Sequence, residues 1–453
     1  MIDCGLQIAD LSSEALAEED CGLRGAGASM RMGGTDSETG TDRRRGLIAG
    51  GGARGAVWVA LAVAAVALTV VLAARIARPH GLALEVSTIV ETSDQRDLSV
   101  DRIAATVRKL AGYGSRVTGY GGDRRAEELI RRQLRQAGIT DIQLQPFQVA
   151  VPITESAYLT PQAGRSDEVV PLHPLWPNLA RTSQTPPDGL TGPLVYVGKG
   201  TDAELAGKKI AGSILLIDWD SDRQWLSAGE FGAKAVIFRA SDRGTGYAAR
   251  EKFLTVPANI PRFYVTEADA PAMDALARSN ATVTVRCRMD WRQVEARNIL
   301  ALVTPGDPSA DPGDPDQTPI IFHAYYDSIS VVPSLSPGAE QACGAAVLLE
   351  LARFLAEMPA APRRPVYALL TAGHGQSLSG MIHFVSELRR GLGEGWTQAE
   401  SDSLLARMGP PGLFVGLDLT SRSERMGVFC AGHFRGQNLS RLRSKYSVLG
   451  QRL

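Results

Sequence analysis

Four polar residues stand where apolar, strand-like segments of the second half of the chain end: Asp327, Glu340, His374 and Asp418. In parallel α/β sheets, ligands bind at the carboxyl ends of the strands, so these side chains are the first candidates for a site. An imidazole and carboxylates suit Zn²⁺, and the metal lowers the pKa of a bound water so that a carboxylate can take its proton. The residues therefore offer a candidate hydrolytic metal site, in which His374 is the catalytic candidate.

Each of these residues also has a structural interpretation. An Asp that ends a strand before a loop, as Asp327 does, is often a turn former, and a His such as His374 commonly caps a strand–helix turn. Asp418 could pack or cap locally. Cys343 precedes an apolar helix whose positive end would lower the pKa of its thiol, so a Cys343–His374 hydrolase is an alternative. No third orienting residue is evident for that dyad, and a small buried Cys is the simpler interpretation.

The elements that carry these residues follow the pattern of an α/β sheet. After a Pro/Asp/Gly loop at 306–319, apolar strands alternate with helices as far as the last candidate residue. Strands that are apolar throughout indicate a mostly parallel sheet with helices on both faces. The stretch 192–290 has short strands, Gly-rich turns and its own helices, which predicts an inserted small mixed α/β domain. The larger domain then comprises 81–191 and 291–453, the latter apparently truncated at its C-terminus.

The start of the larger domain predicts a helix followed by a strand. Apolar residues between 123 and 137 follow helical spacing, and Gly138 fits the left-handed position after a helix end. A strand is predicted over 142–149.

The longest apolar run of the chain covers residues 55–74. It holds twenty residues without a charge, enough to cross a hydrocarbon core of ~30 Å at about 1.5 Å per residue. More than fifty residues precede it, so an uncleaved transmembrane anchor is favoured over a signal peptide or a buried helix. Four arginines precede it within 43–54 and two follow, which predicts a cytoplasmic N-terminus and an extracytoplasmic folded region. Residues 1–46 are Gly-, Ser- and acid-rich and are predicted to be a disordered cytoplasmic segment.

Composition excludes some partners. The formal net charge of −1, with 21% charged residues, argues against nucleic-acid binding, which usually needs a basic face. Five cysteines are scattered without a CxxC pair, so neither a disulfide framework nor a zinc ribbon is expected.

Four motifs occur in a recognisable order. They are GSRVTGYGGDRRAEELIRRQLRQAG, HAYYDS, PGAEQACGAAVLLELAR and TAGHGQSLSGMIHFV. Their order and spacing, from about Asp101 to Asp418, resemble the zinc aminopeptidase and glutamate carboxypeptidase family of peptidase clan MH. In this comparison 192–290 looks like the family's protease-associated insert. The resemblance implies a zinc exopeptidase-like fold and, in active members, two zinc ions that hydrolyse peptides.

The resemblance also implies positions for the metal ligands, and several differ here. HAYYDS places Tyr325 where a ligand His is expected, while the supporting Asp is retained as Asp327. His323 lies two residues earlier on the same strand face, roughly 6–7 Å away by strand rise, and cannot replace that ligand without rearrangement. Glu340 or Gln341 stands at the position of the bridging Asp, in a loop that is one residue short.

The remaining positions are changed in the same way. His374 and Gly375 occupy the positions of a Glu–Glu pair, which removes both the general base and a ligand. Asp418 matches a later Asp ligand, and no match for the family's final His was found. The dinuclear site is therefore predicted to be lost, with no zinc bound unless the ligands have been rewired.

Two functions follow from this pattern. The first is a non-catalytic membrane-anchored ectodomain that binds peptides or proteins, as nicastrin and nicalin illustrate by analogy. The alternative is an active membrane-bound metallo-exopeptidase in which His374, Glu340 and Asp418 hold zinc in a rewired site. Either is compatible with the chain being a piece of a longer multipass protein.

Overall fold

The computed structural model describes several stretches of the chain. They are residues 5–9, 98–162, 169–240, 246–254, 257–307, 309, 317–420 and 427–430. The predicted anchor at 55–74 lies outside them, as does most of the segment 1–46 predicted to be disordered. Gly5–Ala9 of that segment forms a strand. Within the stretches above, no helix is both long and apolar enough to cross a membrane.

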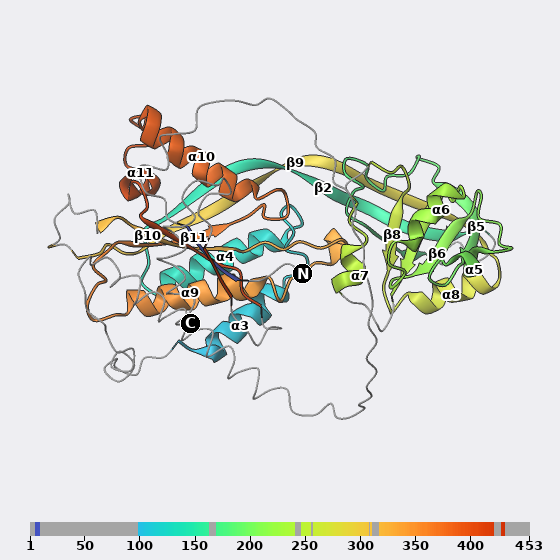
Figure 1. The fold of residues 1–453 in the computed structure, drawn as a ribbon, viewed down its shortest axis with the longest axis horizontal. Coiled ribbons are helices and arrows are strands. Elements are labelled where there is room, and N and C mark those ends of the chain that lie inside the picture. Colours follow the sequence, from blue (N-terminus) through green and yellow to red (C-terminus); the bar gives the residue numbers. More distant parts are fainter. Residues whose placement is uncertain are drawn as a thin grey trace, which may run out of the picture.

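The described strands and helices lie in the order of an α/β protein (Figure 1). The strands are β1 (Gly5–Ala9), β2 (Ile142–Pro161), β3 (Val170–Pro171), β4 (His173–Pro174), β5 (Leu190–Tyr196), β6 (Ile214–Asp218), β7 (Ala235–Arg239), β8 (Arg262–Val265), β9 (Thr282–Thr304), β10 (Ile320–Tyr325), β11 (Val366–Thr371), β12 (Leu413–Leu417) and β13 (Gly427–Cys430). The α-helices are α3 (Val100–Ala111), α4 (Gly122–Gln136), α5 (Asp202–Leu205), α6 (Ser227–Glu230), α7 (Gly246–Arg250), α8 (Ala270–Arg278), α9 (Ala342–Ala356), α10 (Ser379–Glu394) and α11 (Leu404–Met408).

One continuous sheet joins the two parts of the molecule. Its main path runs β13-β1-β12-β10-β11-β9-β5-β6-β7-β8-β4, and β2 lies along the other side of β9. β2 and β9 are long antiparallel strands paired from Ile142–Ala301 to Pro161–Val283. β11 pairs with one end of β9 and β5 with the other, so this ribbon carries the sheet from the larger part into the insert (Figure 1). The predicted boundary at 290/291 falls inside β9.

The strand directions are mixed. β10 pairs in parallel with both β11 and β12, and β5 to β8 are parallel to one another. β9 is antiparallel to β11, β2 and β5. The predicted parallel α/β pattern is therefore present in each part, and an antiparallel ribbon joins them.

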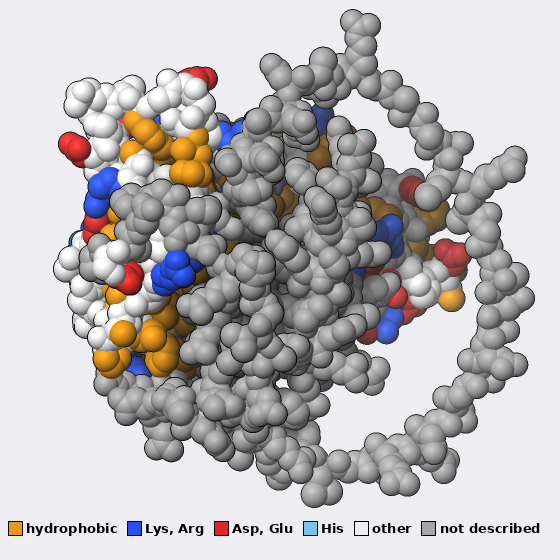
Figure 2. All heavy atoms as spheres, turned by 60° about the vertical axis from the view of Figure 1, so that its left-hand side comes forward, with side chains coloured by type: hydrophobic (Ala, Val, Ile, Leu, Met, Phe, Trp, Pro, Cys, Tyr) orange, Lys and Arg blue, Asp and Glu red, His pale blue; other side chains and the backbone are white. Residues whose placement is uncertain are grey.

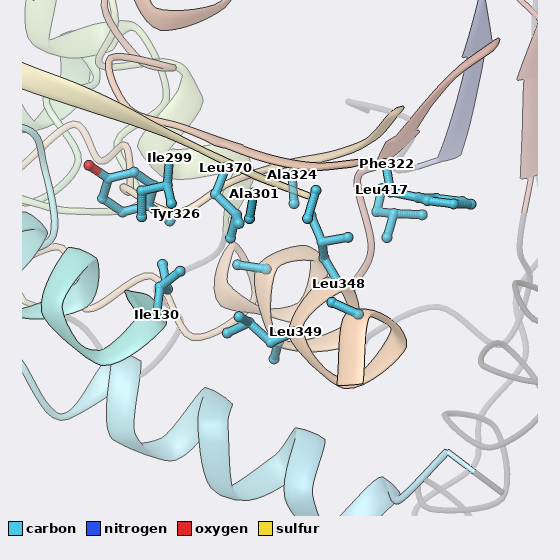
Figure 3. Close-up of a cluster of buried hydrophobic side chains, with 14 of the residues drawn as sticks. Ile130, Ile299, Ala301, Phe322, Ala324, Tyr326, Leu348, Leu349, Leu370 and Leu417 are labelled. Carbon is cyan, nitrogen blue, oxygen red and sulfur yellow. The ribbon is translucent and has the colours of Figure 1, made fainter. Parts of the chain in front are cut away.

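Helices cover both faces of the sheet in the larger part, because successive strand side chains point to opposite faces. Ile320, Phe322 and Ala324 face α3, α4 and α9 in one core, whereas Ile321 of the same strand faces α10 and α11 in another. Figure 3 shows the first core, with Leu348 and Leu349 of α9 facing strand residues. Figure 2 shows hydrophobic side chains also gathered on the outer surface at this end of the molecule.

Close packing sets α9 beside the last strand of this group. A Cβ at Gly344 would collide with the backbone carbonyl of Leu417. Only glycine therefore lets the start of α9 lie so near the end of β12, where Asp418 follows.

Candidate functional site

The ends of β10, β11 and β12 bring three of the predicted residues together. The hydroxyl of Tyr325 donates a hydrogen bond to Oδ1 of Asp418 at 3.1 Å. The Tyr325 ring stacks on the His374 imidazole, with centroids 3.8 Å apart and planes at 18°. Burial lowers the pKa of His374, and the charge of Asp418 opposes that shift. Tyr325 therefore stands between the imidazole and the carboxylate that would be metal ligands.

Asp327 lies beneath this group and is fully buried. Its Oδ2 accepts hydrogen bonds from the hydroxyl of Thr118 at 2.9 Å and from the backbone N–H of His374 at 3.1 Å. Its Oδ1 has no hydrogen-bond partner. Burial raises the pKa of Asp327 to about 7, against the effects of these hydrogen bonds and of the Arg116 charge. Asp327 thus fixes the loop that carries His374 onto the end of β10.

Glu340 and Gln341 have different surroundings. Glu340 Oε2 accepts a hydrogen bond from the Thr420 hydroxyl, two residues beyond Asp418. Gln341 binds the backbone of Ile329 twice, accepting from its N–H at 2.9 Å and donating to its carbonyl at 3.0 Å. Gln341 therefore ties down the loop after β10, and Glu340 is the carboxylate near the strand ends.

The turn after His374 has little room for a second acidic side chain. A Cβ at Gly375 would lie 3.1 Å from three side-chain atoms of Ile329. Ser377 and Leu378, further along the turn, both adopt left-handed conformations, with φ of 57° and 59°. Such conformations cost of order 1–3 kcal/mol each and are typical of loops shaped by their surroundings.

His323 and Cys343 are not part of the group. His323 Nε2 lies 2.9 Å from the Thr371 hydroxyl, and burial lowers the pKa of His323 to about 3, so its imidazole is neutral. The Cys343 thiol donates to the carbonyl of Ala339 at 3.7 Å. No hydrogen bond described for either side chain joins it to His374, so nothing here supports the Cys343–His374 hydrolase.

The donors present do not fit a zinc centre. Zinc ligands direct lone pairs at the metal, but here Asp418 accepts a proton from Tyr325 and the face of His374 is covered by the Tyr325 ring. Gly375 supplies no donor. Within the described stretches, no group of three or more His, Cys, Asp or Glu side chains could hold a metal ion. The rewired site of His374, Glu340 and Asp418 is therefore not formed in this structure.

Two residues of the site were missed from the sequence. Arg116 is fully buried and donates to the backbone carbonyls of Tyr326 at 3.1 Å and Gly338 at 3.0 Å. Thr118 donates to Asp327 and also accepts from the backbone N–H of Gly373 at 3.1 Å. Both belong to the motif GSRVTG, and a cation between two apolar segments was the one available signal.

Comparisons with known proteins place this region among peptidases. No curated protein matches the chain. A zinc aminopeptidase from Bacillus subtilis is 22% identical with a TM-score of 0.45, over 64% of this chain and 66% of that chain, just under two thirds. An aminopeptidase from Aneurinibacillus sp. strain AM-1 is 23% identical with a TM-score of 0.36, over 68% of each chain.

A peptidase M28 precursor from Shewanella amazonensis SB2B is 16% identical with a TM-score of 0.44, over 71% of this chain and 85% of that chain. The family model described as Peptidase family M28 matches residues 303–446. The part of the chain that carries Tyr325, His374 and Asp418 is therefore similar to peptidase family M28.

Proposed function

We propose that this chain is a membrane-anchored relative of the M28 zinc peptidases that has lost dinuclear zinc catalysis and binds peptides or proteins instead. The observation that carries the proposal is the Tyr325–His374–Asp418 arrangement, in which a phenol fills the place between two would-be ligands. The similarity of residues 303–446 to family M28 supplies the ancestral activity against which the loss is measured.

Loss of the general base supports the same proposal. Where the family resemblance expects a Glu–Glu pair, this chain has His374 and Gly375. His374 is half-buried, and burial lowers its pKa, so the imidazole is mainly neutral near pH 7. A neutral imidazole under an aromatic ring, with no carboxylate beside it at position 375, does not reproduce a base that deprotonates a metal-bound water.

The binding role is supported by what the fold keeps. Both cores of the larger part are closed and apolar, so loss of the ligands has not been accompanied by loss of the scaffold. Such a scaffold presents strand ends and an insert as rigid surfaces, which is how non-catalytic relatives such as nicastrin and nicalin would serve by analogy.

Hydrolysis of aminoacyl 4-nitroanilides in the presence of zinc tests the proposal. We expect the wild-type chain to release no more 4-nitroaniline than the Asp418→Ala variant. Hydrolysis by the wild type that disappears in both Asp418→Ala and His374→Ala would instead establish the active metallo-exopeptidase with rewired ligands.

The membrane assignment is part of the proposal and rests on the apolar run at 55–74 and its flanking arginines. Fractionation with a reporter fused after Leu453 tests it. We expect the wild type in the membrane fraction with the reporter outside the cytoplasm, and a variant lacking 55–74 in the soluble fraction. Wild-type protein in the soluble fraction would contradict the anchor.

A further inference from the structure

Two adjoining hollows lie on the insert, on either side of the turn that follows α5. The first has a volume of about 690 Å³ and an apolar floor that includes Pro193, Val195 and Ala277. The second has a volume of about 520 Å³ and is lined by apolar side chains that include Leu205 and Phe231.

Lys208 and Lys209 line both hollows, so the two form one surface, called here the double-lysine surface. It lies near α5 and α8, at the end of the molecule furthest from α10 and α11 (Figure 1).

The acidic groups near this surface are already neutralised. Arg239 contacts Asp218 at 3.3 Å and Asp274 at 2.9 Å. The hydroxyl of Tyr196 also donates to both carboxylate oxygens of Asp218, at 3.1 and 3.0 Å. This network uses the charge of Arg239 to cancel the nearby carboxylates and forms a fixed polar wall at the first hollow.

Three other cations remain available at the surface. Lys208 Nζ donates one hydrogen bond to the carbonyl of Tyr196 at 2.7 Å, which orients it and leaves further N–H donors. Lys209 and Arg278 have no carboxylate partner in the part of the chain that the structure describes. The charge of this surface is therefore positive around apolar hollows, on a chain whose formal net charge is −1.

We propose that the double-lysine surface binds an extended acidic segment of a partner protein. Carboxylates of the segment would pair with Lys208, Lys209 and Arg278, while its apolar side chains would enter the two hollows. Charge complementarity favours this occupant over a neutral apolar segment, which would leave Lys208 and Lys209 partly desolvated without a counter-charge. The assignment rests on the proposed binding role but not on the loss of zinc chemistry, because the surface is remote from His374.

A charge-reversal experiment tests this surface. The purified full chain is titrated against a fluorescein-labelled peptide of alternating Glu and Leu, and binding is followed by anisotropy. Lys209→Glu/Arg278→Glu is compared with Arg132→Glu/Arg389→Glu, which makes the same charge change at exposed helical positions elsewhere. We expect the first variant to bind at least about tenfold more weakly, about 1.4 kcal/mol, and the control to stay within about twofold of the wild type.

The remaining arms separate the alternatives. Phe231→Ala, which removes a half-exposed side chain from the second hollow, is expected to weaken binding while leaving thermal unfolding unchanged. Equal binding by the two charge-reversal variants, equal binding of the matching Gln–Leu peptide, or equal displacement by duplex DNA would each overturn the proposal. Nitroanilide hydrolysis measured on the same preparations keeps the outcome separate from the question of catalysis.

Discussion

Replacing Asp327 by Asn should change the pH dependence of stability in a calculable way. Burial raises the pKa of Asp327 from 3.8 to about 7. Because the folded state holds this proton more tightly than the unfolded chain, the stability it contributes is fully present below pH 3.8 and lost as the pH rises through about 7. Three pKa units at 1.36 kcal/mol each correspond to about 4 kcal/mol. An Asn keeps an oxygen that can accept from Thr118 and His374 without the charge.

Urea unfolding of both proteins at about pH 5 and about pH 8 measures this effect. We expect Asp327→Asn to be similar to the wild type at the lower pH and more stable by up to about 4 kcal/mol at the higher pH. Asp188→Asn, at an exposed position, is the control and should show no such trend. A variant that is less stable than the wild type at pH 8 would refute the reasoning, because it would mean that Arg116 holds Asp327 ionised in the fold.

Two further substitutions test the core and the turn after His374. Leu370→Ala should cost about 2–5 kcal/mol of unfolding free energy because Leu370 is fully buried, whereas Ile382→Ala, at a position 57% exposed, should stay within about 0.5 kcal/mol. Equal losses in urea unfolding would contradict this core. Gly375→Glu should cost about 1–3 kcal/mol because of the contact with Ile329, and it should not confer zinc binding. Gly393→Ala has open space in α10 and should stabilise by up to about 1 kcal/mol; a Gly375→Glu protein as stable as the wild type would show that the turn has room for an acid.

Local sequence patterns predicted the helices and strands of the larger part well. The helix expected over 123–137 is α4, and its apolar stripe is buried, because helical spacing and a following glycine are local signals. The strand expected over 142–149 is the first part of β2, which continues to Pro161. Its second half contains PITES and lacks a clear apolar pattern. That half is a strand because β9, more than a hundred residues away, pairs with it.

The candidate site was predicted in outline for a similar reason. Parallel strands end at one edge, so the meeting of Tyr325, His374 and Asp418 could be expected from β10, β11 and β12. The role of Asp327 could not, because its partner Thr118 lies 209 residues away in the chain. Side-chain pairing over such distances leaves no periodic signal in the sequence.

Metal content of the purified full chain tests the central claim most directly. After dialysis against trace zinc and removal of free metal, elemental analysis should find close to zero zinc per chain, since Tyr325 and Gly375 stand where donors are needed. One or two equivalents of zinc in the wild type, lost in Asp418→Ala or His374→Ala, would contradict the account and show that the metal site has been rebuilt.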